Sequence, residues 1–119
     1  MCYWKSQTAH RKLVLMSSKL QYFRIYWESS SLKGDGAIHL WATRGEEARS
    51  KVRERIEQHP DRYPEDATIW MTTSVPIDVK VDQCVICSGD LERVTDDHIA
   101  GQKYRCKSCG RFLWVESIA

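Results

Sequence analysis

Four cysteines in two pairs are the residues of this chain whose type and spacing point most directly to chemistry. They form a Cys84-x-x-Cys87 motif and a Cys106-x-x-Cys109 motif, separated by eighteen residues. Two such pairs at this separation are typical of zinc sites, because four thiolates can close a tetrahedron around Zn²⁺ and leave no position for water or substrate. We therefore expect one structural Zn²⁺, held by Cys84, Cys87, Cys106 and Cys109.

These motifs and the residues that follow them resemble a zinc ribbon, a family of small β modules held by two such knuckles. Ser88-Gly89 and Gly110 directly follow the second cysteine of each pair, where a tight turn needs a permissive backbone. The resemblance covers roughly residues 79–116, and within it we expect short strands at 91–94, 103–105 and 112–115. Zinc ribbons recur in transcription, translation and nucleic-acid-processing proteins. The resemblance therefore implies a partner that is nucleic acid or a protein of such machinery.

Disulfide bonding is the alternative use of these cysteines. The chain has five cysteines, an odd number, and no secretory signal precedes them, which favours a reducing compartment. The apolar stretch at 13–16 is too short for a membrane span. We therefore expect a cytoplasmic protein without membrane association, in which Cys2 is an ordinary thiol.

The chain before residue 79 carries the patterns of three strands and one helix. Alternating apolar and polar residues predict strands at 20–28, 37–43 and 67–75. A helix is expected at 46–58, with Thr43 and Glu46 at capping-box spacing. The predicted fold class is α+β, with a small ββαβ sheet-plus-helix domain at 1–78 followed by a four-cysteine zinc ribbon at 79–119. Residues 1–12 are expected to be ordered only if their aromatic side chains dock.

The helix has one narrow apolar stripe, which should pack on one face of the sheet. Ala48, Val52 and Ile56 recur every four residues. The more aliphatic face of the sheet should lie against this stripe, and Gly34-Asp35-Gly36 should form a turn before the second strand. The residues expected on that face are Phe23, Ile25, Ile38, Leu40, Ile69 and Met71.

The opposite face of the sheet is rich in aromatic side chains and is the candidate binding surface. Rings beside a guanidinium can stack on nucleic-acid bases. The same composition also suits a protein partner, and the rings could instead pack under the N-terminal segment or the ribbon. The candidate residues are Tyr22, Arg24, Tyr26, His39, Trp41 and Trp70.

The charge balance limits what kind of partner the chain can hold. Its formal net charge is +2, and four thiolates with one Zn²⁺ would bring it close to zero. A protein that binds mainly by counterion release usually has a larger basic excess. This balance disfavours a purely electrostatic nucleic-acid binder, and it supports a protein–protein adaptor or inhibitor as the alternative function.

No residue pattern in the chain demands catalysis. The histidines lie in separate segments and no pair of acidic residues recurs at motif spacing. The fragment Asp97-His98-Ile99 resembles part of the zinc-bearing HNH nucleases. Only seven residues separate His98 from Cys106, however, too few for that family's strand and helix. A non-catalytic protein is therefore expected, with an HNH-like remnant as a minor alternative and a solvated turn histidine as the simpler account of His98.

Overall fold

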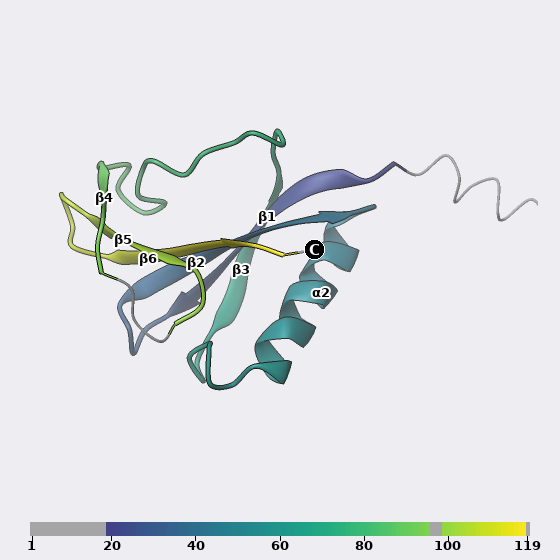
Figure 1. Ribbon diagram of the computed structural model, residues 1–119, viewed down its shortest axis with the longest axis horizontal. Coiled ribbons are helices and arrows are strands. Elements are labelled where there is room, and N and C mark those ends of the chain that lie inside the picture. The colour runs from purple at the N-terminus through teal and green to yellow at the C-terminus, as the bar shows by residue number, and fades with distance from the viewer. Residues whose placement is uncertain (1–18, 96–98, 119) are drawn as a thin grey trace, which may run out of the picture.

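A mixed six-stranded sheet with one helix on it makes up the computed structural model, which describes residues 19–95 and 99–118 (Figure 1). The α+β class is thus confirmed. The predictions for residues 1–16, Asp97 and His98 lie outside the described residues. No helix in the described ranges is long and apolar enough to cross a bilayer. The elements are β1 (Gln21–Ser29), β2 (Gly34–Ala42), α2 (Gly45–Gln58), β3 (Thr68–Ser74), β4 (Leu91–Arg93), β5 (Gln102–Cys106) and β6 (Phe112–Ser117).

The strand order β3-β1-β2-β6-β5-β4 joins the two predicted parts of the chain in one sheet. β1 pairs antiparallel with both β2 and β3, as β5 does with β4 and β6. The connection between the two groups is a parallel pairing of β2 with β6, from Gly34 opposite Phe112 to His39 opposite Ser117. The last strand of the cysteine-bearing segment is therefore hydrogen-bonded to the middle of the sheet. The division into two domains near residue 78 stays a prediction.

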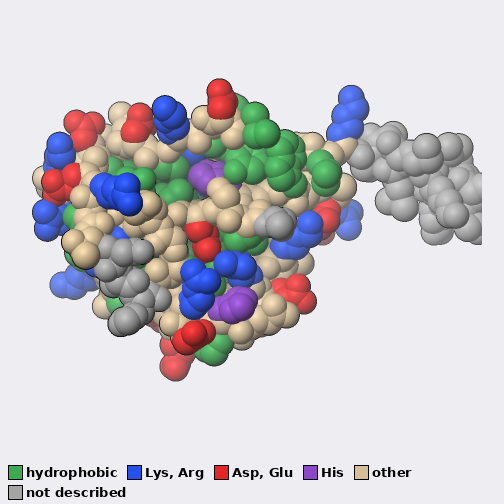
Figure 2. Space-filling view, in the orientation of Figure 1, with side chains coloured by type: hydrophobic (Ala, Val, Ile, Leu, Met, Phe, Trp, Pro, Cys, Tyr) green, Lys and Arg blue, Asp and Glu red, His purple; other side chains and the backbone are tan. Residues whose placement is uncertain are grey.

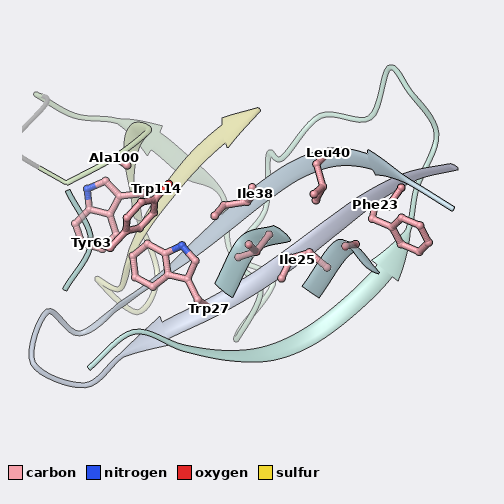
Figure 3. Packing of buried hydrophobic residues seen from close by; sticks show 11 residues of the cluster. Phe23, Ile25, Trp27, Ile38, Leu40, Tyr63, Ala100 and Trp114 are labelled. Atoms are coloured by element: carbon pink, nitrogen blue, oxygen red, sulfur yellow. The ribbon is translucent and has the colours of Figure 1, made fainter. Parts of the chain in front are cut away.

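The predicted apolar stripe of α2 packs on the sheet. Ala48 and Val52 are fully buried, and Ile56 packs against the same core. Figure 3 shows the side chains of Phe23, Ile25, Ile38 and Leu40 on this helix-side face, with Trp27, Tyr63 and Trp114 gathered beyond them. The rings of Trp27 and Trp114 are stacked at 6.0 Å between centroids. One core therefore extends from the helix to β6.

The helix start uses a different carboxylate from the predicted one. Arg44 is the N-cap residue and makes no side-chain capping bond. Glu47, not Glu46, reaches back to Thr43, whose backbone N–H and hydroxyl both donate to Oε1 at 2.8 and 2.5 Å. These bonds hold the pKa of Glu47 down at about 2. The N-cap is Arg44, one residue after the Thr43 that the capping-box spacing implied, so the carboxylate in the first turn that can reach back is Glu47 and not Glu46.

Gly34-Asp35-Gly36 was wrongly expected to form a turn, because all three residues belong to β2. The glycines leave room for tryptophans. A Cβ on Gly34 would lie 2.5 Å from the Trp114 ring, and one on Gly36 would lie 1.9 Å from the Trp27 ring. The actual turn is at residues 30–33. These glycines therefore allow the two tryptophan rings to pack closely on the sheet.

A β-bulge separates Ile69 from Met71, which were both expected on the helix-side face. The register of β3 against β1 shifts between Tyr26 and Trp27, so that Met71 opposes Tyr26 while Ile69 opposes Trp27. Ile69 packs on the helix-side core, whereas Met71 packs with Tyr26 on the other face. The prediction for Met71 was wrong because an inserted residue reverses the alternation of a strand.

The chain after β3 crosses the second face of the sheet without forming a strand. Residues 77–82 lie in turn and irregular structure. The Arg24 guanidinium donates to the Lys80 carbonyl at 3.5 Å, and Val81 packs against a second small core centred on Tyr26, Ala37 and Leu113. Part of the second face is therefore covered by this crossing segment.

Candidate metal centre

The four cysteines of the two motifs converge on one point. Their Sγ atoms all lie within 4.8 Å of one another, with Cys84 to Cys109 at 3.7 Å and Cys87 to Cys106 at 3.3 Å. A metal–sulfur bond of about 2.3 Å in a tetrahedron corresponds to sulfurs about 3.8 Å apart. The donor set and its spacing therefore fit one tetrahedral metal ion, and four sulfur ligands suit zinc or iron best.

The first knuckle is built by hydrogen bonds across its own turn. The Ser88 N–H donates to the Cys84 carbonyl at 2.9 Å, and the Cys84 N–H donates to the Gly89 carbonyl at 2.8 Å. Ser88 has a φ of 63°, in the left-handed region. This backbone turns the chain sharply enough to bring the sulfurs of Cys84 and Cys87 to the same side.

The second knuckle repeats the same pattern. The Gly110 N–H donates to the Cys106 carbonyl at 3.0 Å, and the Cys106 N–H donates to the Arg111 carbonyl at 2.9 Å. Gly110 has a φ of 77° and occupies the place that Ser88 has in the first knuckle. The two motifs are therefore two copies of one local structure facing each other, as the predicted pair of knuckles requires.

Gly89 permits the two knuckles to approach each other. A Cβ at Gly89 would lie 2.5 Å from the Ser108 Oγ and 3.0 Å from the Cys106 Sγ. Any side chain there would push the second knuckle away from the first. The glycine is therefore needed for the packing between the knuckles, whereas the left-handed position of this turn is Ser88.

Backbone N–H groups point at two of the sulfurs. The Ile86 N–H donates to the Cys84 Sγ, and the Cys109 N–H donates to the Cys106 Sγ, both at 3.4 Å. The hydrogen bond from the Cys109 N–H is the main cause that lowers the pKa of Cys106. Such bonds favour the thiolate, which is the form that binds metal. Cys84 and Cys106 are also buried, while the other two sulfurs lie nearer the surface.

An ion pair ties the second knuckle to the start of β2. Arg111 follows Gly110 and donates from Nε to the Asp35 Oδ2 at 2.5 Å and from Nη2 to Oδ1 at 3.3 Å. Asp35 is only 1% exposed. The hydrogen bonds that Arg111 donates to Asp35 are the main cause that raises the pKa of Arg111. This two-pronged contact fixes the metal centre against the sheet.

The candidate binding residues on the second face form a contiguous cluster. The Tyr22 ring lies 5.5 Å from His39 and 5.0 Å from Trp41, while Tyr26 lies 5.8 Å from Trp70. Trp41 and Trp70 are 36% and 40% exposed, whereas Tyr26 and His39 are buried. The sequence thus correctly grouped these side chains, but only part of the group reaches solvent. Their role in binding stays a prediction.

The guanidinium of Arg24 is hydrogen-bonded within this cluster. Its Nε donates to the His39 Nε2 at 3.0 Å and its Nη1 donates to the Tyr26 hydroxyl at 3.2 Å. Burial, followed by the charge of Arg24, lowers the pKa of His39 to about 4. The imidazole is therefore neutral at physiological pH and accepts a hydrogen bond from the guanidinium.

This neutral histidine predicts a loss of stability in mild acid. Because the folded-state pKa of about 4 lies below the ordinary 6.5, the unfolded chain takes up its proton first as the pH falls. The stability contributed by neutral His39 is complete above pH 6.5 and is lost as the pH falls toward 4, by up to roughly 3 kcal/mol. Urea unfolding of the parent protein and of His39→Gln at several pH values measures this pH-dependent loss of stability.

Glutamine can accept the Arg24 hydrogen bond but does not titrate, so it is the matched control. Any acid-induced loss of metal affects both proteins alike and cancels in the difference. The difference in unfolding free energy between parent and variant should shrink from pH 7 to pH 4. A constant difference across that range would show that His39 does not titrate as described.

The sequence did not predict two partly buried polar contacts at the edges of the core. One is the Asp35–Arg111 pair. The other joins Tyr63, Arg55 and Glu116: the Tyr63 hydroxyl donates to Glu116, and the Arg55 Nε donates to that hydroxyl at 2.7 Å. Burial, followed by the bond to Glu116, raises the pKa of Tyr63. Asp35 and Arg111, and likewise Tyr63 and Glu116, are far apart in the chain, so spacing alone gave no signal for these contacts.

The assignment of a function to this chain rests on the geometry of its cysteines. The four-sulfur cluster and the paired knuckles agree with the resemblance noted from the sequence. Across family models, curated proteins and solved structures, the chain has no match.

Proposed function

We propose that Cys84, Cys87, Cys106 and Cys109 hold one structural Zn²⁺ in a non-catalytic binding protein. The observation that carries the proposal is the convergence of the four sulfur atoms within 4.8 Å, from two knuckles of the same local structure. Four thiolates complete a zinc tetrahedron, so the metal has no open position for water or substrate. The ion would hold β4, β5 and β6 in place and thereby complete the sheet beside β2.

Removal of the metal tests this proposal through the fold. The expected result of chelation under reducing conditions is loss of sheet structure and of the fixed tryptophan environment, because Trp114 on β6 packs against Trp27. Binding of a structural zinc supplies roughly 10–16 kcal/mol in small zinc-dependent modules. Adding back one equivalent of Zn²⁺ should restore the native spectrum. An unchanged circular dichroism spectrum and melting temperature after complete metal removal would contradict a structural role.

For the partner, we propose nucleic acid or a protein of the transcription or translation machinery, bound at the exposed part of the second face. Trp41 is the exposed ring of the Tyr22–Trp41 pair. Figure 2 shows hydrophobic side chains gathered where the start of β1 and the end of β2 meet the chain that follows β3. An exposed indole beside a second ring supports stacking on a base.

The change Trp41→Ala is expected to weaken binding while leaving the fold nearly unchanged. A stacked ring is worth about 1–3 kcal/mol per base, which corresponds to an affinity loss of about five- to 150-fold. Fluorescence anisotropy with single-stranded RNA and DNA, together with the melting temperature, measures both effects. A large fall in melting temperature would assign Trp41 to the core. Absence of nucleic-acid binding by the parent protein would leave a protein partner as the better account.

A protein adaptor or inhibitor is the second candidate, and the engagement of Arg24 favours it. The guanidinium of this residue contacts His39, Tyr26 and the Lys80 carbonyl, so it is not free for a phosphate. Leu20, just before β1, and Ile77, in the chain that follows β3, are exposed apolar side chains. Exposed apolar side chains near an aromatic cluster suit a surface that meets another protein. The Trp41 experiment therefore also separates these two partner classes.

A further inference from the structure

Strand β3 forms one edge of the sheet, and its outer backbone edge has no partner strand in the described ranges. The strand Thr68-Ile-Trp-Met-Thr-Thr-Ser74 contains no charged residue and no proline. Natural proteins usually protect such an edge with lysine, proline or a covering segment. The bulge at Trp70 leaves the stretch Met71–Ser74 in regular register with β1. This edge is therefore a template for one more strand.

A hollow opens beside this edge, between β3 and α2. Its volume is about 400 Å³, and its apolar lining comes from Ile56, Ala67 and Ile69. In an added strand, alternate side chains point to opposite faces of the sheet. Those on the helix side would meet this hollow. Those on the other side would meet Trp70, which is 40% exposed and lies on the second face beside Tyr26.

The charges around the hollow define which side chain would fit. Glu57 and Glu65 line the hollow and are exposed. Arg53, also on the lining, lies about one helical turn earlier on α2. Because Arg49 bonds to Thr72, the N-terminal part of α2 lies toward the C-terminal end of β3. The two carboxylates therefore make the Thr68 end of the hollow negative, whereas Arg53 lies toward the other end.

We propose that the β3 edge binds an extended peptide segment of a partner protein, with a lysine or arginine entering the hollow beside α2. The aliphatic stem of that residue packs on Ile56, Ala67 and Ile69, and its cation meets Glu57 and Glu65. The backbone of the segment supplies the hydrogen bonds that the edge of β3 lacks. Such β-strand addition takes its affinity from main-chain bonds and its specificity from pockets for alternate side chains. The site is separate from the metal centre and from Trp41.

A selection with displayed random octapeptides against the full, metal-loaded chain tests the proposal. The enriched peptides should carry a lysine or arginine and lack proline. Their binding should weaken at least about tenfold in the double variant Glu57→Gln/Glu65→Gln, since both carboxylates that would meet the peptide's cation are removed. Glu54→Gln is the control for the helix position, because it removes one carboxylate charge from the same helix at an exposed position outside the hollow. It should leave binding within about twofold.

Methylation of the peptide backbone tests the strand pairing without altering the protein. Alternate amide N–H groups of an added strand point toward β3 and the others point to solvent. N-methylation of one alternate set should therefore abolish binding, while methylation of the other set leaves most of it.

Three results would overturn the proposal. The first is a selection that yields no binder, and the second is binding that is insensitive to the carboxylate variants. The third is a dimer of this chain whose dissociation exposes the β3 edge, which would assign the edge to a second copy.

Discussion

Replacing Cys106 by serine is expected to abolish metal binding and unfold the protein. The free energy that a structural zinc supplies, roughly 10–16 kcal/mol, is as large as the whole stability of a typical domain, about 5–15 kcal/mol. Cys106 is 1% exposed and ends β5, whose neighbour β6 pairs with β2. Loss of the metal should therefore spread from the knuckles to the middle of the sheet. Circular dichroism and metal content of the purified variant measure the result.

Ser108→Ala is the control for this substitution. Ser108 lies in the same knuckle but is exposed and offers no sulfur, so its change should alter the unfolding free energy by less than about 1 kcal/mol. A Cys106→Ser protein that keeps one tightly bound metal and the melting temperature of the parent would contradict the assigned ligand set.

Arg111→Ala should be the second most damaging change. It would leave the carboxylate of Asp35 buried at 1% exposure without its guanidinium. Removing one partner of a buried ion pair typically costs about 3–5 kcal/mol, since the other charge remains uncompensated. The side chain of Arg111 is 26% exposed, so the lower end of that range is expected. Urea unfolding of the metal-loaded variant gives the value.

An exposed arginine–carboxylate ion pair supplies the matched comparison. Arg105 contacts Glu92 at 2.7 Å, and the two side chains are 50% and 37% exposed. Water screens such a pair, so Arg105→Ala should cost no more than about 1 kcal/mol. Equal losses for the two arginine variants would show that the Asp35–Arg111 pair does not anchor the knuckle to the sheet.

The features that short sequence patterns predicted well are local ones. The two cysteine motifs constrain their own turns, because each knuckle closes by bonds within six residues, such as Cys84 N–H to the Gly89 carbonyl. The helix followed equally local signals, since Ala48 and Val52 of its predicted apolar stripe are buried. Alternation along β1 and β2 placed Ile25 opposite Ile38 on one face. In each case neighbours in the chain determine the structure.

The features that the sequence did not predict depend on residues far apart in the chain. Gly36 suggested a turn, yet it lies in β2. A glycine is needed at this position because the Trp27 ring occupies the space of a side chain. Met71 lies on the face of the sheet opposite to the predicted one, because of a bulge that only the pairing of β3 with β1 reveals. Asp35 and Arg111 are 76 positions apart, and their contact follows from the parallel pairing of β2 with β6. Spacing rules carry no information about such contacts.

The metal content of the natively purified, reduced protein tests the central claim most directly. Elemental analysis by mass spectrometry, combined with an accurate protein concentration, should find one zinc per chain, and the Cys106→Ser protein should contain almost none. Folded parent protein with well under one metal ion per chain would contradict a structural metal centre at these four cysteines. One iron per chain would keep the four-sulfur site but contradict its assignment to zinc.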